Sequence, residues 1–479
     1  MQLPISDRRA RETSKLQCVL IWIGMAVLCM PAASADQLSD NLPASSSSLS
    51  EVGAIGGHAY SLKELLEIAQ RASPAARVAG ESAQQADIAA QLVRSNYSPQ
   101  VSVKALGGFQ RTPVAIPDNV SPQGYFISNT KELIPSLELK WLLFDFGRRK
   151  GREEEADQVA LAAHAMTLGT REKLAFDVTQ GYFELGSAKG RLEAARKVLE
   201  TALITESAAN AGQKRGRATV VVVAQAQLQS AAARLGVAKA SGAVRIAAAN
   251  LVSTVGLPIG TEIELSVEPD DYSGRESNLP LKAFIDQAVQ SRPDVLAAQD
   301  EIYAAQAKVD TAHAAYRPTI SFLTQLFQNA GQVSSDGSPY SSIDKPGGAV
   351  FLAIEMPLLD GGVRANNVAL AVSEKSAAED KLDEARDAAS AQVVRAYNDL
   401  KTGMEERTEA EAYVAASNTA FDATLASYKR GLATYPDLAS SEAALAQALS
   451  AREDAISDVQ IARSALALAT GTLQVDTQE

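Results

Sequence analysis

Few side chains in this 479-residue sequence are spaced for chemistry. The three histidines, His58, His164 and His313, lie far apart, and both cysteines, Cys18 and Cys29, fall in one apolar N-terminal stretch. This spacing fits neither a zinc site nor a disulfide framework. Because no nucleophile, metal-ligand or phosphate-binding motif stands out, we expect no catalytic residues, no metal and no cofactor.

A motif of an aspartate, one or two glycines and an arginine occurs twice, each time where an alternating apolar segment gives way to a helical pattern. Its members are Asp145, Gly147 and Arg149 in the first copy and Asp360, Gly361, Gly362 and Arg364 in the second. A carboxylate at a helix start accepts backbone N–H bonds and favours the positive end of the helix dipole. The arginines are candidate partners for carboxylates or lipid phosphates. The motif therefore predicts a strand-to-helix junction with a structural role.

A second motif, Lys-Arg-Gly, interrupts two helical patterns. It comprises Lys214, Arg215 and Gly216 in one place and Lys429, Arg430 and Gly431 in the other. Basic residues followed by glycine are typical of helix C-termini. Each motif therefore predicts the tip of a helical hairpin, although a solvated helix end adequately explains the charges.

These motifs belong to a tandem repeat. Residues 62–74 match residues 281–293, and the later motifs match in order at a near-constant spacing. Ordered matches of this kind indicate a duplication. We expect repeats at 58–257 and 281–473, a connector at 258–280 and a C-terminal tail at 474–479.

Each repeat combines two periodicities. Apolar residues at steps of three and four, such as Leu382, Ala389, Val393 and Leu400, predict long helices with narrow alanine-rich faces that pack as coiled coils. Alternation of period two predicts four strands, at about 100–110, 135–144, 319–328 and 349–358. We expect the segments 111–132 and 330–348, which are rich in Pro, Gly, Asn and Ser, to be strand-joining loops.

Each predicted strand has the ~9 to 11 residues that a tilted strand needs to cross a bilayer, although a half-buried soluble hairpin would show the same alternation. Four strands per chain would leave an open sheet with unpaired backbone groups in hydrocarbon. A membrane barrel must therefore close between chains. A dimer, a trimer or a larger ring could close it, and a conducting pore favours at least a trimer.

The N-terminus predicts export. Basic residues precede the apolar run from Cys18 to Met30, and Ala33-Ser-Ala35 has the small residues of a cleavage site, so we expect a signal peptide at 1–35 and a flexible segment at 36–57. The run is shorter than the ~20 residues of a transmembrane anchor. The net charge of −12 argues against nucleic acid as a partner.

The sequence resembles the TolC-type outer membrane efflux protein family. The resemblance is carried by the strand-to-helix motifs at 141–149 and 356–364, Tyr-x-Pro at Tyr97 and Tyr316, and the tip motif at 428–437. It implies a mainly α fold with a small β part, in which a coiled-coil α-barrel joins a transmembrane β-barrel of four strands per protomer. It also implies a homotrimer in the outer membrane lipid, extending into the periplasm and working with a periplasmic adaptor (a membrane fusion protein) and an inner-membrane transporter.

The resemblance further places Tyr428 and Asp437 near a closed periplasmic entrance. This sequence departs from the family pattern there, because Val222 and Ser440 stand where aspartates are expected and Ala433 stands where an arginine is expected. We therefore predict a gate, formed by Tyr428, Asp437 and Val222, that closes more by packing than by salt bridges. Asp437 could instead be a solvated residue after a turn.

The leading functional prediction is a passive exit duct for efflux or type I secretion. A periplasmic coiled-coil adaptor, a protein connector rather than a channel, is the main alternative, and it would have one helical hairpin flanked by soluble β-domains. A periplasmic enzyme is a third class, for which the sequence offers no motif. The sequence does not identify the exported substrate, the adaptor or the energy source of the pump.

Overall fold

The computed structural model describes residues 59–116, 124–266 and 280–473; the predicted signal peptide, the whole flexible segment, part of the connector and the C-terminal tail lie outside these ranges. All described elements belong to one compact unit, residues 59–479. Its elements are β1 (Ala59–Tyr60), α2 (Leu62–Ala72), α3 (Pro74–Ser95), β2 (Gln100–Ala115), β3 (Tyr125–Phe144), α4 (Arg148–Lys214), α5 (Val220–Val255), β4 (Glu264–Leu265), α6 (Leu281–Ser291), α7 (Pro293–Ala314), β5 (Thr319–Ser335), β6 (Ser341–Glu355), α8 (Val363–Lys429) and α9 (Tyr435–Thr470).

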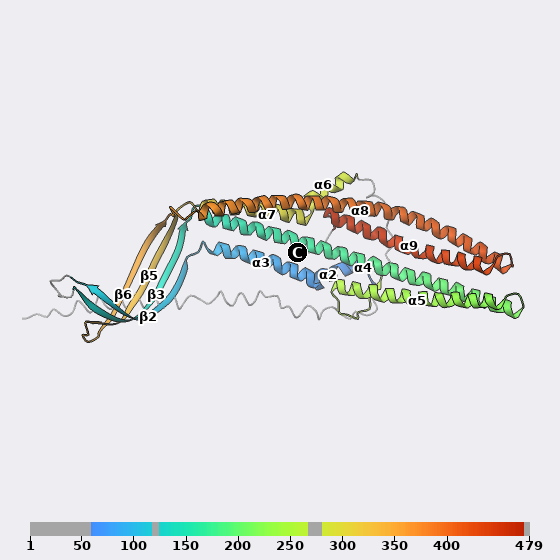
Figure 1. Ribbon diagram of the computed structural model, residues 1–479, viewed down its shortest axis with the longest axis horizontal. Helices are drawn as coiled ribbons and strands as arrows, with labels where there is room; N and C mark the ends of the chain where they lie inside the picture. Colours follow the sequence, from blue (N-terminus) through green and yellow to red (C-terminus); the bar gives the residue numbers. More distant parts are fainter. Residues whose placement is uncertain (1–58, 117–123, 267–279, 474–479) are drawn as a thin grey trace, which may run out of the picture. The chain divides into compact units, whose positions relative to one another are not determined.

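The helices of the two repeats have the same lengths. Helices α2 and α6 have 11 residues each, α3 and α7 have 22, α4 and α8 have 67, and α5 and α9 have 36. A helix of 67 residues is ~100 Å long at ~1.5 Å per residue, so α4 and α8 run the full length of the helical part (Figure 1). The duplication predicted from the sequence is therefore present as two copies of one helix set.

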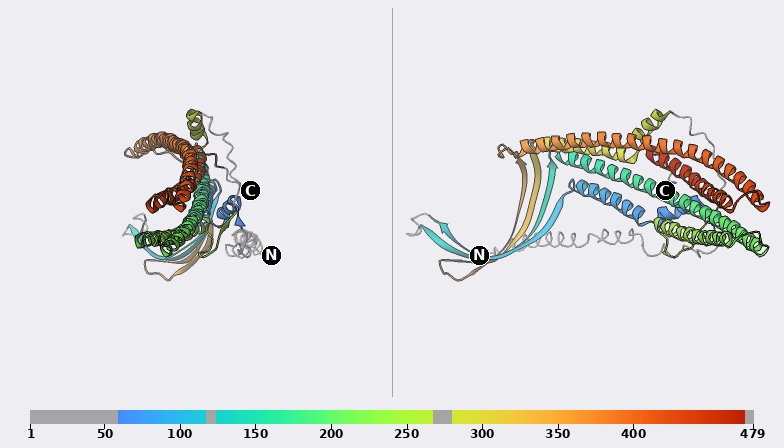
Figure 2. Two further views of the ribbon diagram at one scale, coloured as in Figure 1. Left: turned by 90° about the vertical axis from the view of Figure 1, so that its right-hand side faces the viewer. Right: turned by 45° about the vertical axis from the view of Figure 1, so that its right-hand side comes forward.

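The helices pack side by side in a fixed order. In the half of the helical part nearer the strands the order is α3-α4-α7-α8. In the half that is farther from the strands the order is α5-α4-α9-α8 (Figure 2). Most buried side chains in this row are small, and alanines such as Ala175, Ala209, Ala389 and Ala448 are almost fully covered. Small side chains allow helix axes to approach closely over long distances. In both orders α4 of the first repeat contacts a helix of the second, which makes the seam between repeats.

The strands form one antiparallel sheet in the order β2-β3-β5-β6. Two boundary predictions were wrong: residues 111–115, 125–132, 330–335 and 341–348 are paired strand residues rather than loops, whereas residues 356–358 follow the end of β6. Proline and glycine caused the first error. Pro113 and Pro346 lie on β2 and β6, the two edge strands, where a missing N–H is tolerated.

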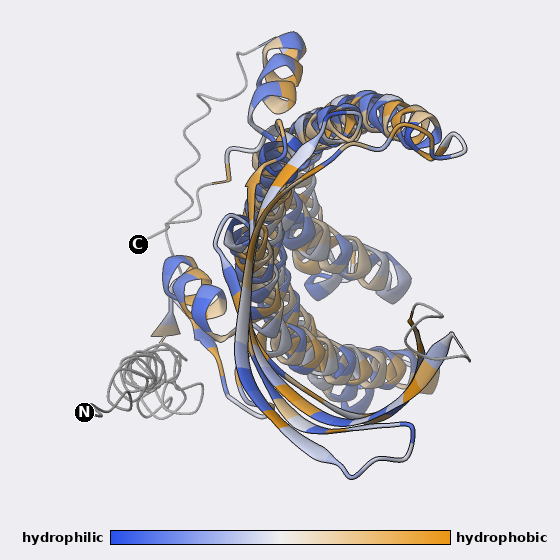
Figure 3. Cartoon of the chain, turned by 90° about the vertical axis from the view of Figure 1, so that its left-hand side faces the viewer, coloured by the Kyte–Doolittle hydropathy of each residue, from blue (hydrophilic) through white to orange (hydrophobic). Residues whose placement is uncertain are grey.

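Strand pairing sorts the side chains onto two faces. Cross-strand partners share a face, so one row across the sheet joins Val101, Leu139, Thr324 and Val350, and the next joins Ser102, Glu138, Gln325 and Ala349. On the polar face Lys104 Nζ lies 2.5 Å from Glu138 Oε2. Hydrophobic and hydrophilic residues accordingly alternate along the strands (Figure 3).

The protomer leaves two kinds of surface uncovered. Strands β2 and β6 each have one edge that no strand of the described residues pairs with. Within these residues only α5 is long and apolar enough to cross a membrane by length and composition, and it exposes Val221, Leu228 and Leu235 at 63%, 70% and 57%. Their seven-residue spacing is that of a coiled-coil seam. A further chain could cover both surfaces.

Candidate functional site

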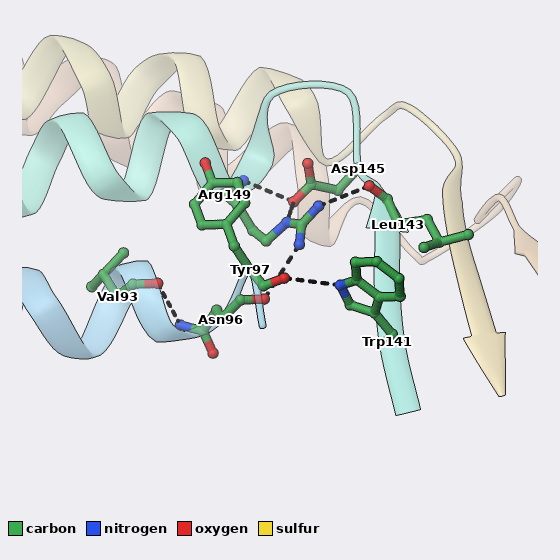
Figure 4. A network of polar contacts seen from close by, with 7 residues as sticks. All are labelled: Val93, Asn96, Tyr97, Trp141, Leu143, Asp145 and Arg149. Atoms are coloured by element: carbon green, nitrogen blue, oxygen red, sulfur yellow. Dashed lines mark hydrogen bonds and ion pairs between the residues drawn. The ribbon is translucent and has the colours of Figure 1, made fainter. Parts of the chain in front are cut away.

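The first strand-to-helix junction is organised around a buried ion pair. Asp145 Oδ2 accepts a hydrogen bond from the Arg149 backbone N–H at 2.8 Å and from Arg149 Nε at 3.1 Å (Figure 4). The other two guanidinium nitrogens of Arg149 donate to backbone oxygens, Nη1 to Asn96 at 3.3 Å and Nη2 to Leu143 at 3.1 Å. Asp145 thus caps α4 while Arg149 ties the end of α3 to the end of β3. Both residues are less than 10% exposed.

Aromatic side chains complete this junction. The Arg149 guanidinium lies 4.6 Å from the centre of the Tyr97 ring, within cation–π range. Trp141 Nε1 donates to the Tyr97 backbone oxygen at 2.9 Å (Figure 4). Gly147 has a φ of +105°, which glycine adopts without steric cost. The residues predicted from the first motif therefore meet in one structural network.

The second junction repeats this geometry in a more open form. Asp360 Oδ2 accepts from the backbone N–H and Nε of Arg364 at 3.1 and 2.6 Å, and Arg364 lies 4.8 Å from the centre of the Tyr316 ring. Gly361 and Gly362 have φ values of +65° and +91°. The hydrogen bond from Arg364 holds the pKa of Asp360 below its ordinary value. The Asp360 side chain is 26% exposed against 7% for Asp145, because β6 is an edge strand.

One contact joins the first junction to the second repeat. Arg317, which lies two residues before β5, donates from Nη1 to the backbone oxygen of Phe146 at 2.9 Å. Phe146 itself has a φ of +54°, so this hydrogen bond holds a strained turn. Sequence periodicity gave no indication of the contact, because it spans 171 residues.

The two Lys-Arg-Gly motifs lie at the far ends of the long helices. Helix α4 ends at Lys214 and α8 at Lys429, and the glycines that follow, Gly216 and Gly431, have φ values of +70° and +79°. In each tip a backbone N–H beyond the glycine closes the helix, from Arg217 to Gly212 O at 2.8 Å in the first. The motifs are thus the turns of two helical hairpins, α4/α5 and α8/α9.

Two of the three predicted gate residues meet beside these tips. Val222 and Tyr428 pack against a buried cluster of Ala209, Val223, Ala226 and Tyr435. The Tyr428 and Tyr435 rings lie 6.3 Å apart in an edge arrangement. Tyr435, which is not among the predicted gate residues, is the largest of the four buried side chains of the cluster. Apolar packing therefore closes the first helix turns of α5 and α9 against α4.

Asp437, the third predicted gate residue, has a different environment. Its Oδ2 accepts from the Thr434 backbone N–H at 2.8 Å and from Thr434 Oγ1 at 2.6 Å, which makes a capping box at the start of α9. These hydrogen bonds lower the pKa of the exposed Asp437 carboxyl. It is therefore a helix cap that stays ionised at neutral pH, and it lies outside the apolar cluster.

Comparison with known proteins shows the family to which this chain is similar. The family model described as "Outer membrane efflux protein" matches residues 65–257 and 284–472. Protein CyaE of Bordetella pertussis is 30% identical over 350 residues, which cover 71% of this chain and 69% of CyaE. The cation efflux system protein CusC of Escherichia coli is 24% identical over 324 residues, 66% of this chain and 68% of CusC.

Solved structures share the fold. A crystal structure of CusC matches with a TM-score of 0.72 at 21% identity, covering 86% of this chain and 92% of that one. The outer membrane channel CmeC of Campylobacter jejuni gives 0.72 at 16% identity, with 87% of each chain covered. The predicted fold class, a helical barrel joined to a membrane β-barrel, is confirmed.

The doubled hairpins, the strands that end in capped junctions and these matches define an outer-membrane channel for efflux or secretion. The chain belongs to the outer membrane efflux protein family. This family consists of channel proteins, which decides against the alternative of a periplasmic adaptor. The predicted location in the outer membrane is likewise confirmed.

The two junctions should differ in stability. Changing Asp145 to Ala leaves Arg149 buried without its partner, which costs about 3–5 kcal/mol of unfolding free energy. Changing Asp360 to Ala should cost clearly less, since water reaches that carboxylate. Denaturant unfolding of the detergent-solubilised variants measures both values, and equal losses would contradict this account of the junctions.

Proposed function

We propose that three copies of this chain form a continuous duct from the periplasm through the outer membrane. The sheets of three protomers supply twelve strands for one barrel, and their hairpins form one helical tunnel. The contact between β3 and β5, inside the protomer, carries this proposal. Because the repeats are equivalent, β6 of one copy can pair with β2 of the next in the same way.

The helices support the same arrangement. Inside the protomer α9 packs against both α8 and α4, whereas its counterpart α5 packs against only one long helix of the described residues, α4. Repetition of the seam places the α8 helix of a neighbouring copy on the exposed apolar face of α5. A dimer would give an eight-stranded barrel, whose interior side chains fill, so three copies are the smallest ring that leaves a channel.

In this proposal the duct is passive and has no catalytic function. An inner-membrane transporter supplies the energy, and a periplasmic adaptor docks at the hairpin tips, where Lys214 and Arg215, Lys429 and Arg430 place positive charge next to the two turns. CusC, by its name, belongs to a cation efflux system. Export of small molecules and type I secretion of proteins both remain compatible with such a duct.

The number of protomers is directly measurable. Native mass spectrometry of the membrane-extracted protein in mild detergent should give three protomer masses, because only ring closure pairs the edges of β2 and β6. A mass equal to one protomer would refute the proposal.

The tips should be required for export but not for assembly. Replacing Gly216 and Gly431 by Val strains two turns with φ near +70° and +79°, which changes the docking surface while leaving the strands intact. Export should fall strongly in a complemented deletion strain, with trimer yield unchanged.

Gly260 provides a matched control for this experiment. Its φ is +96°, no atom crowds its Cβ position, and it lies in the connector far along the chain from the tips. Gly260→Val should leave export intact. Normal export by the double tip variant would place the docking surface elsewhere.

The predicted gate belongs to this proposal. Three copies would bring three Asp437 carboxylates to the tunnel entrance, and the cluster around Tyr435 would close the helices by packing. Like charges around one axis attract cations and resist tight closure. Tyr428 and Val222 would then act as the packing part of the gate and Asp437 as its charged part.

Planar bilayer recordings test this gate. Asp437→Asn should weaken cation selectivity and divalent-cation block several-fold. Because the Thr434 hydrogen bonds lower the pKa of Asp437, the wild-type block should persist until the pH falls below the ordinary value of 3.8. Val222→Asp should raise the resting conductance, since it puts a charge into the apolar cluster. Unchanged selectivity, block and conductance in both variants would refute this gate.

A further inference from the structure

Glu442 is a buried carboxylate without a partner. It lies on α9, two turns beyond Tyr435, and only 2% of the residue is exposed. Within the described residues neither carboxylate oxygen has a hydrogen-bond partner. An ionised carboxylate in such a place is costly, so groups of this kind are usually paired or neutral.

Glu442 lies at the seam between the repeats. It borders a cavity of about 350 Å³ between α4, α5 and α9. Half of the lining residues are alanines, and the polar ones besides Glu442 are Arg191, Gln229 and Ser450. The cavity gives the side chain room to change its hydration without unfolding the helices.

Among the described residues that line the cavity, no free charge compensates Glu442. On α4 the only charged wall residue is Arg191, and its guanidinium is already paired with Asp454. Helix α5 contributes only neutral wall residues, and no residue of α8 borders the cavity. On α9 itself Tyr435 is buried with an unpartnered hydroxyl, and burial together with Glu442 raises its pKa. Burial alone accordingly raises the pKa of Glu442 to about 7.

The equivalent seam in the proposed ring, between α5 and α8 of a neighbouring copy, has different side chains at these positions. At the repeat spacing of 215, Glu442 corresponds to Gln227, Ala443 to Leu228 and Ser450 to Leu235, all on α5. An amide of the same size replaces the carboxylate, and two leucines replace the small residues beside the cavity. At the position of Glu442, α9 therefore carries a titratable side chain and its counterpart α5 does not.

We propose that Glu442 is a proton-operated latch on the seam between α4 and α9. The protonated side chain holds the helices together, and its ionisation draws water into the cavity and loosens α9 from α4. The role of this loosening in opening the duct rests on the proposed function. In the trimeric ring three seams would respond to protons and three would not.

The direction of the pH effect follows from ionisation in the two states. A glutamate freed from the seam ionises near 4.5, whereas the packed one ionises at about 7. The seam is therefore strongest below about pH 4.5, weakens as the pH rises from there to about 7, and is weakest above that value. The equilibrium between open and closed seam should change on the order of a hundredfold over this window.

Hydrogen–deuterium exchange of the intact oligomer in detergent tests the latch. Peptides spanning 198–209 and 435–450 report on the two sides of the seam. Comparing wild type with Glu442→Gln at the same pH cancels the chemical pH dependence of exchange. We expect the wild type to exchange only a few-fold faster than Glu442→Gln at pH 5, where loosening has just begun, and this ratio to be at least tenfold larger at pH 8. A ratio that does not change between pH 5 and pH 8 would overturn the proposal.

Two further variants keep the result interpretable. Glu409→Gln removes an exposed carboxylate of α8 and should leave the exchange ratio at one; a response equal to that of Glu442→Gln would overturn the specific role of Glu442. If Glu442→Gln does not assemble, Glu442→Met provides a neutral side chain of similar length. It should abolish the same pH dependence.

Bilayer conductance separates the latch from the duct. A normal channel with flat exchange ratios refutes the latch and leaves the duct intact. Exchange that responds to Glu442 in a protein that never conducts supports the latch and contradicts the duct.

Discussion

Backbone hydrogen bonding at the edges of the sheet is the constraint on which the structure depends. A strand edge cannot remain unpaired in hydrocarbon, where each lost hydrogen bond costs several kcal/mol. This chain has four strands and leaves β2 and β6 open. The duplication satisfies this constraint, because the strand pairing that joins the two repeats within a chain can be repeated between β6 of one chain and β2 of the next. The long helices continue the same order of contacts away from the sheet.

The charged residues serve this architecture rather than chemistry. The Asp145–Arg149 pair has its polar groups bonded to the ends of three elements, so the helical rods leave the sheet at a fixed angle. Its counterpart at Asp360 and Arg364 has fewer bonds because it follows an edge strand. The same motif therefore has two environments, and the difference arises from the open side of the protomer.

Much of this could be predicted from the sequence because it depends on local patterns. Repeat spacing and helical periodicity gave the hairpins, and Lys-Arg-Gly gave their tips. Strand ends were wrong where Pro113 and Pro346 suggested loops, because only the sheet order reveals that they lie on edges. Tyr435 and Glu442 escaped notice for a similar reason. Gln227, the counterpart of Glu442, is exposed in the protomer, so burial at this position depends on which helix lies opposite.

The hydrogen bond from Arg317 to Phe146 has a consequence for biogenesis. At the repeat spacing of 219, Ser98 of the first repeat corresponds to Arg317. At the spacing of 215, Gly361 of the second repeat corresponds to Phe146. A serine is too short to reproduce the reach of an arginine, so this hydrogen bond within a chain cannot recur at the equivalent contact between chains. The repeats are also tethered, which gives them an effective concentration on the order of millimolar. Each newly made chain should therefore join its own two halves before it meets another, and the ring should assemble from finished protomers rather than from exchanged halves.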